Sequence, residues 1–472
     1  MIELMIVCGL ILLICISSSK ILYKFGIPML LIFIVLGMIF GSDGIVGIYF
    51  DNYQLTSIVS SLALVFIMFY GGFGTNWKMA RKSAVPSILM SSFGVIITAG
   101  LTGLFCHYVL KTSILEGLLI GAVVGSTDAA SVFSVLRSQK LNLKGTLAPL
   151  LEIESGSNDP IAYMLTIIIL TLMSNGGVSL IIPMLIKQIL FGIITGSILA
   201  RISVYILKRA NFEVEGFYTI FVTAVAILSY ALSEYIGGNG YLSVYMAGII
   251  LGNNRIPHKK SLVHFFDGLS WIMQIGLFFV LGLLAFPSKL PEVFVISIAI
   301  SLFMMFIARP LATFIILKWF DYSNKEKIFI SWVGFRGAAS IVFAIYTVTY
   351  GVDIGNDIFH IIFFIALLSV SIQGTFTPIL AKKLDLVDDN MPVLKTFNDY
   401  KEDKSTKILE INIDENSKWV NKTIMDSDIP EEVLVVMIRR NNDVIIPKGS
   451  TEIKKDDILV LASNSFDNLL AN

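Results

Sequence analysis

The sequence predicts a polytopic α-helical membrane protein of about thirteen transmembrane helices, followed by a small α/β cytoplasmic domain. Of its 472 residues, 55% are hydrophobic and only 15% are charged, whereas soluble proteins carry about 25% charged residues. Apolar runs close to the roughly 20 residues needed to cross a bilayer recur over the first 385 positions. After Lys383 the chain becomes charged and its apolar runs become short. The formal net charge is zero, so nothing indicates a nucleic-acid partner.

Hydropathy and length predict the membrane spans in order. They lie near residues 1–19, 28–48, 55–74, 86–110, 114–135, 148–172, 181–207, 216–235, 239–252, 268–287, 292–317, 327–350 and 357–381. The ninth of these is short and glycine-rich.

The loops between these spans alternate in charge. One side carries 18 of the Lys and Arg residues before position 386, and the other side carries three, namely Lys111, Lys187 and Lys289. Cytoplasmic loops carry the excess of basic residues. The sequence therefore predicts an N-terminus outside a cell membrane and a C-terminal domain in the cytoplasm.

Two spans contain a similar interruption. Residues 125–136 read "GSTDAASVFSVL" and residues 334–345 read "GFRGAASIVFAI". If spans 1–6 and 8–13 form two units, these stretches correspond and the units have inverted topology. Interrupted helices at matching positions of inverted halves indicate a transporter's binding site. The alternative is that the small residues only let helices pack closely.

Ionisable residues occur inside several predicted spans. Span 6 holds Glu152, Glu154 and Asp159, although an acid at the bilayer centre costs roughly 2.5–3.5 kcal/mol on insertion scales. Arg309 and Arg336 lie in spans 11 and 12. Such residues usually face partners within the bundle. We expect Glu154 to form a structural ion pair with Arg336 or Arg309.

The strongest candidate for a functional acid is Asp159. Ser155 and Asp159 are four positions apart, so they share one helix face, and Asn158 is adjacent. Thr127 and Asp128 interrupt span 5, where opened backbone would offer carbonyl oxygens. Hard oxygen ligands of this kind suit alkali cations. The pattern predicts a site, centred on Asp159 and Ser155, that holds either a monovalent cation or a proton.

Enzymatic chemistry is not indicated. The glycine-rich stretches lack the lysine of a phosphate-binding loop. A serine hydrolase built on "ESGSND" would need a histidine base at membrane depth, but all four histidines fall at predicted helix ends or in loops. We expect no catalytic residues and no cofactor.

Several motifs together resemble the NhaP-type monovalent cation/proton antiporters, most closely the potassium/proton subgroup. They are "GSTDAA", "LEIESGSNDP", "GYLSVYMAGIILGN", "FFDGLSWIMQIGLFFVLGLL" and "GFRGAASIVFA". The resemblance covers residues 1–385 and implies thirteen helices in two inverted six-helix repeats with crossed broken helices. It also implies a homodimer that works by alternating access, with a core bundle moving against a dimer bundle.

The same resemblance implies roles for individual residues. Asp159 would carry both proton and cation, with Ser155 as a cation ligand. Asn158, directly before Asp159, resembles the residue found at this position in the electroneutral branch, which exchanges one cation for one proton. Thr127 and Asp128 match the unwound-helix positions. Glu154 resembles the acid that pairs with an arginine on the opposing broken helix, here Arg336.

One position departs from the family pattern. Relatives often carry an acid before a Gly-Gly pair after span 3, whereas this chain has Tyr70 before Gly71 and Gly72. Tyr70 is either a phenol lining the site or an aromatic packing residue.

The tail divides into a charged linker, residues 386–404, and a domain, residues 405–472. Four β-type runs, "TKILEINID", "EVLVVMIRRNN", "DVIIPKG" and "DDILVLAS", are separated by turn residues, with a helix expected near 416–427. The domain resembles the RCK_C (TrkA-C) module, which implies dimerisation. Some such domains bind cyclic di-adenosine monophosphate; the alternative is a purely structural dimer clamp.

The sequence thus predicts a secondary antiporter that exchanges K⁺ or Na⁺ for H⁺ and is tuned by its tail. The alternative is a tail-regulated ion channel or ion-sensing membrane protein. A titratable residue beside interrupted helices favours exchange, and the carbonyl filter sequence of K⁺ channels does not occur.

Overall fold

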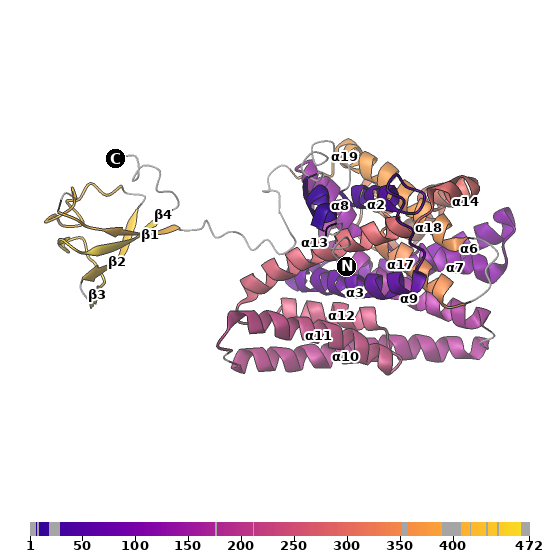
Figure 1. Ribbon diagram of the computed structural model, residues 1–472, viewed down its shortest axis with the longest axis horizontal. Coiled ribbons are helices and arrows are strands. Elements are labelled where there is room, and N and C mark those ends of the chain that lie inside the picture. The colour runs from indigo at the N-terminus through magenta and orange to yellow at the C-terminus, as the bar shows by residue number, and fades with distance from the viewer. Residues whose placement is uncertain are drawn as a thin grey trace. The chain divides into compact units, whose positions relative to one another are not determined.

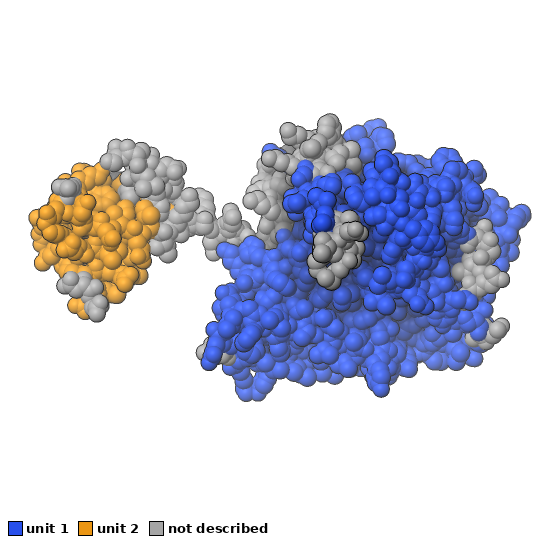
Figure 2. Space-filling model, viewed as in Figure 1, with its two compact units in different colours: residues 1–398 blue, residues 399–472 orange. Residues whose placement is uncertain are grey.

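The computed structural model describes residues 6, 9–17, 29–174, 177–210, 212–351, 357–388, 407–415, 417–430, 433–440 and 443–463. The chain forms two compact units, residues 1–398 and residues 399–472 (Figure 2). The expected linker 386–404 and the first expected span 1–19 lie largely outside the described residues, although residues 9–17 are helical.

Unit 1 is helical throughout its described length (Figure 1). Its first half comprises α2 (Met29–Phe40), α3 (Tyr53–Gly74), α4 (Trp77–Ala80), α5 (Ala84–Leu89), η2 (Met90–Gly94), α6 (Val95–Leu110), α7 (Ile114–Val123), α8 (Ala129–Ser138) and α9 (Leu147–Met173). Its second half comprises η3 (Val178–Leu180), α10 (Ile181–Arg209), α11 (Glu215–Tyr235), α12 (Gly240–Gly252), α13 (Lys259–Leu284), η4 (Pro287–Lys289), α14 (Leu290–Phe303), η5 (Met304–Ala308), α15 (Arg309–Leu317), α16 (Asn324–Trp332), α17 (Ala338–Thr349), α18 (Ile358–Leu368), η6 (Ser369–Gln373) and α19 (Gly374–Lys383).

Eight continuous helical stretches of the described chain are long and apolar enough to cross a membrane. Each of the thirteen expected spans overlaps helical residues, but three differ from continuous helices. The second span is shorter than expected, because α2 ends at Phe40 and glycines follow at positions 41, 44 and 47. The fifth and twelfth spans are each two half-helices separated by extended residues, α7 with α8 and α16 with α17.

Three π-helical turns occur inside long helices. They are η2 between α5 and α6, η5 between α14 and α15, and η6 between α18 and α19. Single π turns inside α-helices are frequent at functional sites. The first two lie in the helices that precede the two interrupted spans, so both halves of unit 1 carry a π turn followed by a broken helix.

Glycines bring α3 and α12 into close contact. These helices lie beside α10 and α11 in one layer of unit 1 (Figure 1). A Cβ added at Gly72 would lie 2.4 Å from the Tyr245 carbonyl oxygen, and one at Gly248 would lie 2.5 Å from that of Phe69. Small residues allow this backbone approach, as is common between helices in membranes.

Unit 2 is built on a four-stranded antiparallel sheet. The strands are β1 (Lys407–Asn412), β2 (Leu434–Arg440), β3 (Asp443–Ile445) and β4 (Ile458–Ser463), in the order β1-β4-β2-β3. All four lie within the predicted β-type runs. The sheet covers a small core that includes Ile413, Trp419, Ile438, Ile453 and Leu459.

The helix expected near 416–427 is not formed by the described residues of that stretch, which make turns. Their backbone groups bond to residues 449–453 instead. The Asn421 amide donates to the Ile453 carbonyl at 2.9 Å, and the Ile424 amide donates to the Thr451 carbonyl at 3.0 Å. Asn421 also has a φ of 60°, in the left-handed region that interrupts a helix.

Close packing of α3 against α12 predicts that Gly248→Ala destabilises unit 1. The added methyl would overlap the Phe69 carbonyl oxygen, and overpacking of this kind costs about 1–3 kcal/mol. The melting temperature of the purified protein, measured by fluorescence-detected size exclusion, should fall. Gly100→Ala is the matched control, because a Cβ there meets nothing within 4 Å. Equal melting temperatures for the two variants would contradict the expectation.

The buried Asp457 carboxylate predicts a pH-dependent contribution to unit 2. Burial alone would raise the pKa of Asp457, but hydrogen bonds from Arg440 and the Lys454 amide outweigh burial and lower it. A lowered pKa gives stability that is present above the usual Asp range and lost as pH falls through the folded value. Asp457→Asn should therefore speed amide hydrogen exchange in β4 at neutral pH, by the equivalent of about 1–3 kcal/mol. The difference should shrink in acid; a difference independent of pH would contradict this account.

Candidate functional site

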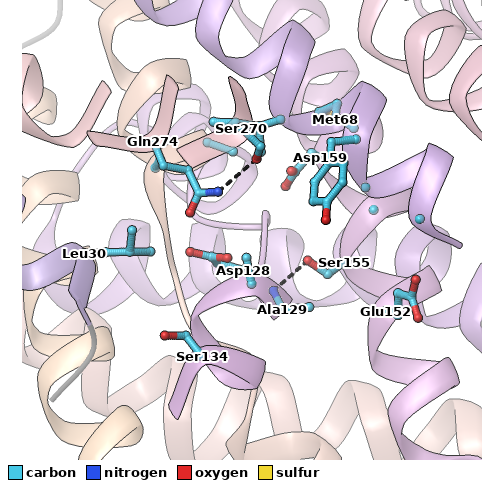
Figure 3. Close-up of a pocket in the computed structure, with 18 of the residues that line it drawn as sticks. Leu30, Met68, Asp128, Ala129, Ser134, Glu152, Ser155, Asp159, Ser270 and Gln274 are labelled. Carbon is cyan, nitrogen blue, oxygen red and sulfur yellow. Dashed lines mark hydrogen bonds between the residues drawn. The ribbon is translucent and has the colours of Figure 1, made fainter. Parts of the chain in front are cut away.

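A cavity of about 600 Å³ lies inside unit 1. It is bounded by α3, α9, α12 and α13 and by the break between α7 and α8, and Figure 3 shows part of its lining. Its volume would hold on the order of 20 water molecules at about 30 Å³ each. A hydrated ion can therefore approach the residues of its wall. Arg137, in the last turn of α8, and Lys140, just after α8, line it as well.

Asp159 reaches this cavity from the middle of α9 (Figure 3). Its Oδ1 accepts a hydrogen bond from the Ser126 hydroxyl, at the break between α7 and α8. The side chain is neither in open lipid nor at the outer surface of the bundle, because it lines an interior cavity.

Ser155 and Asn158 hold the opened backbone at Thr127. The Ser155 hydroxyl donates to the Thr127 carbonyl at 2.7 Å and accepts from the Ala129 amide at 2.8 Å. The side-chain oxygen of Asn158 accepts a hydrogen bond from the Thr127 backbone amide at 3.3 Å, and its side-chain nitrogen donates to the Thr127 hydroxyl. Ser155 and Thr127 line the cavity, whereas Asn158 is fully buried behind it. Ser155 and Asn158 therefore supply hydrogen-bond partners to backbone groups that the break leaves without helical partners.

Asp128 caps the second half-helix of the broken span. Its carboxylate accepts from the Ser131 amide at 3.1 Å and from the Ser131 hydroxyl at 2.6 Å. This arrangement satisfies a free amide at the start of α8 and places a negative charge at its positive end. Asp128 also lines the cavity (Figure 3). A Cβ added at Gly337 would lie 2.4 Å from Asp128 Oδ2, so the second break lies against this carboxylate.

Arg336 joins the two interrupted helices. Its guanidinium donates to the carbonyls of Gly125 and Ser126 at 3.0 Å each. The Asp128 amide donates in return to the Phe335 carbonyl at 2.9 Å. A cation at the carbonyl end of α7 also complements that helix dipole. The two breaks predicted from sequence therefore meet in space.

Glu154 forms its ion pair with Arg309. Arg309 Nη2 donates to Glu154 Oε1, and both side chains are almost completely buried. Direct pairing with Arg336, which the family resemblance implied, is not what the structure has. Arg336 instead binds the carbonyls of the first break, as described above, while Arg309 begins α15 directly after a π turn.

Tyr70 lies in the cavity wall, and its hydroxyl donates to Asp267 Oδ1 at 2.8 Å. The phenol at this position thus binds an acid from α13. A carboxylate remains in this part of the wall, although it comes from a different helix.

Most of the cavity lining was not among the predicted site residues, and four of its polar residues need comment. Ser126 precedes Thr127 in "GSTDAAS", so its place at the break was a usable signal. Glu152 lies seven positions before Asp159 and was noted only as one of the acids of its span. Tyr245 and Asp267 come from α12 and α13, and no local pattern links them to α9.

The buried pair of Glu154 and Arg309 predicts a large effect on stability. Arg309→Met would leave the Glu154 carboxylate buried without its partner, which costs about 3–5 kcal/mol. The variant should show a lower melting temperature and a smaller monodisperse fraction. Glu154→Gln combined with Arg309→Met removes both charges and should recover part of the loss. A double variant less stable than the single one would contradict the pairing.

Comparison with protein-family models finds two matches. Residues 9–383 match the transmembrane domain of the sodium/hydrogen exchanger family, and residues 408–467 match the TrkA-C domain.

Individual relatives agree with this assignment. The K(+)/H(+) antiporter NhaP2 of Shewanella sp. (strain ANA-3) is 35% identical over 448 residues, covering 93% of this chain and 78% of that protein. The K(+)/H(+) antiporter NhaP of Alkalimonas amylolytica is 33% identical, covering 97% of this chain and 80% of that protein. Among solved structures, the sodium proton antiporter MjNhaP1 from Methanocaldococcus jannaschii at pH 8 superposes with a TM-score of 0.70 at 26% identity, covering 81% of this chain and 99% of that one.

The chain forms a helical bundle in which two broken helices touch and an acid lies where they meet. Its tail matches the TrkA-C domain. These features agree with the family matches. The family is one of transporters, so the chain is not an enzyme. The protein belongs to the sodium/hydrogen exchanger family, as a monovalent cation/proton antiporter with a C-terminal TrkA-C domain.

Proposed function

We propose that the protein exchanges one monovalent cation for one proton by alternating access, with Asp159 as the shared site. The observation that carries the proposal is the Asp159 side chain in the cavity wall, bound to the break of the first interrupted helix. Glu154 is paired with Arg309, and Asp128 caps α8. Asp159 has neither a cationic partner nor a capping role among the described contacts. One carboxylate that holds either a proton or a cation gives electroneutral exchange.

The proposed ligands of the cation come from both sides of the break. Asp159 supplies the charge, with Ser155, Thr127 and Asp128 contributing oxygens from the cavity wall. Asn158 supports the site by fixing the Thr127 backbone. Arg336, Glu154 and Arg309 act structurally. Hard oxygen donors of this kind suit alkali cations.

We propose K⁺ as the principal cation. The two K(+)/H(+) antiporters described above cover 93% and 97% of this chain, whereas the superposable structure is named a sodium proton antiporter and is less similar in sequence. The chain also carries Tyr70 where relatives often carry an acid, which alters the set of charges around the cavity. Na⁺ is the alternative cation.

The cavity supports an assignment of the conformational state and of the membrane side to which the cavity opens. Arg137, in the last turn of α8, and Lys140, just after α8, line it, and the charge of this region assigns it to the cytoplasm. On the other side of Asp159, the Tyr346 hydroxyl is bonded to Ser61 at 2.7 Å and to Tyr241 at 3.0 Å. We therefore infer an inward-facing state, closed to the outside by these tyrosines, with the N-terminus outside and the C-terminus in the cytoplasm.

The finer architecture follows from the same features. Thirteen spans in two inverted repeats would place the first break opposite the second, and contacts between the breaks support this arrangement. Along α10, only a small part of the surface is covered by unit 1. We propose that this surface meets the second subunit of a homodimer, while the helices around the breaks move.

We propose that residues 405–472 tune the exchange after a linker at 386–404. The TrkA-C match supports a regulatory role. Cyclic di-adenosine monophosphate is a candidate ligand; a structural dimer clamp is the alternative. Equilibrium dialysis of the full-length protein with this nucleotide distinguishes them, since a clamp binds none.

The central test is Asp159→Asn in everted vesicles with a fluorescent pH indicator. Addition of K⁺ should alkalinise the acid-loaded lumen with the parent protein and have no effect above background with the variant, because an amide holds neither a proton nor the cation's countercharge. Na⁺ and Li⁺ are added separately to rank the ions. Exchange retained in a well-expressed Asp159→Asn variant would remove Asp159 from the mechanism.

A further inference from the structure

The wall of the cavity extends along one face of α9 beyond Asp159. Glu152, Gly156 and Asp159 are at positions i, i+4 and i+7, and all three line the cavity. With a rise of 1.5 Å per residue, Glu152 lies about 10 Å from Asp159 along the helix axis. An ion that moves along this face passes Glu152 before it reaches Asp159.

Two oxygens at this level have no hydrogen-bond partner among the described residues. They are Oε1 of Glu152 and the hydroxyl of Tyr245, both buried as atoms. Tyr245 is only 3% exposed and lines the same cavity from α12. Buried polar groups are nearly always paired, and an unpaired one costs about 1–3 kcal/mol. A cation bound between the two oxygens would satisfy both.

Further oxygens lie beside these two groups. The Thr75 hydroxyl is close enough to act electrostatically on Glu152 and Tyr245, and Ser157 on Tyr245, but neither meets hydrogen-bond geometry with Glu152 Oε1 or the Tyr245 hydroxyl. Thr75 donates its hydrogen to the Gly71 carbonyl at 2.9 Å, so it presents lone pairs to its other neighbours. One carboxylate with neutral hydroxyl oxygens is a hard donor set, which suits an alkali cation.

Gly156 lies between Glu152 and Asp159 on the cavity face of α9. A Cβ at this position would lie 2.7 Å from the Tyr245 hydroxyl and 2.5 Å from its ring, so only glycine leaves the ring in place. Pro160 has no N–H, so the helix supplies no i+4 donor to the Gly156 carbonyl. Because helix carbonyls point toward the C-terminus, the Gly156 carbonyl, which lacks its usual i+4 donor, is directed toward the level of Asp159 and offers an intermediate ligand.

We propose that Glu152, Tyr245 and Thr75 form a second monovalent-cation site that receives the ion from the cavity before Asp159. This site rests on the proposed function for its role in transport, but its binding of a cation does not depend on Asp159. The competing explanation is that Glu152 binds no ion and only adds negative electrostatic potential to the cavity. Asp267 provides the matched control, because it lines the same cavity and is also a carboxylic acid, but it is bound by Tyr70.

Binding is tested with Tl⁺ and purified full-length protein by equilibrium dialysis, with K⁺ as competitor. Asp159→Asn should retain one saturable, K⁺-competed site. Adding Glu152→Gln to this variant should abolish the site, whereas adding Asp267→Asn should preserve it. Tl⁺ binding that survives Glu152→Gln, or that is lost equally with Asp267→Asn, would overturn the proposal.

Transport gives an independent measurement in the Asp159-containing protein. Glu152→Gln should raise the KM for K⁺ on the cavity side about fivefold with little change in maximal rate, because ion capture weakens while Asp159 is intact. Tyr245→Phe should raise KM by a smaller factor and serves if Glu152→Gln folds poorly. Unchanged KM in both folded variants, or an equal rise in Asp267→Asn, would refute the site. Failure of the exchange mechanism would appear separately, as activity retained in Asp159→Asn.

Discussion

Contact between the two helix breaks is the constraint on which the site depends. Backbone groups freed inside a bilayer must find partners in the protein, since each unsatisfied group costs several kcal/mol. Here the Asp128 amide is satisfied by the Phe335 carbonyl, and the free carbonyls of Gly125 and Ser126 are satisfied by Arg336. The same contacts bring Ser126 to Asp159. The same contacts therefore satisfy the free backbone groups and position Asp159. Asp159 cannot move relative to the two breaks without leaving polar groups unpaired.

Charge is distributed around this junction so that one carboxylate stays available. Glu154 is neutralised by Arg309, Asp128 is engaged at the start of α8, and Asp267 accepts from Tyr70. Asp159 receives one hydroxyl and otherwise faces the cavity. Because Glu154, Asp128 and Asp267 have fixed partners, a change of proton or cation at the junction is concentrated on Asp159. Sequence alone marks Asp128, Glu154 and Asp159 as unusual in a membrane, but their partners are what separate structural acids from the exchangeable one.

Much of the architecture is readable from local pattern, because apolar length and loop charge are local properties. The helix breaks at Thr127 and Arg336 and the four strands of the tail are of this kind. Partner choice is not local, because Glu154 and Arg309 are 155 positions apart and only the tertiary fold brings Arg309, rather than Arg336, to Glu154. The turn around Asn421 was mistaken for a helix because its backbone partners, residues 449–453, are distant in sequence. Tyr245 and Asp267 lie in motifs that carry the family resemblance, but nothing in those motifs shows that the two side chains meet α9 in one cavity.

The surface between α9 and α12 bears on how Asp159 could change sides. Across it, the Asn239 side chain donates to the Pro160 carbonyl at 2.7 Å, an acceptor one residue from Asp159. The Tyr245 ring lies over Gly156, and no ion pair joins α9 to α12 among the described residues. A neutral hydrogen bond and an aromatic ring over glycine can be exchanged for similar contacts at small cost, whereas a buried ion pair would resist movement. The rigid ion pair of α9, from Glu154 to Arg309, lies on the side of the broken helices. In the proposed exchange, α9 therefore moves with the breaks and slides against α12, so that its cation site and the repaired backbone travel together.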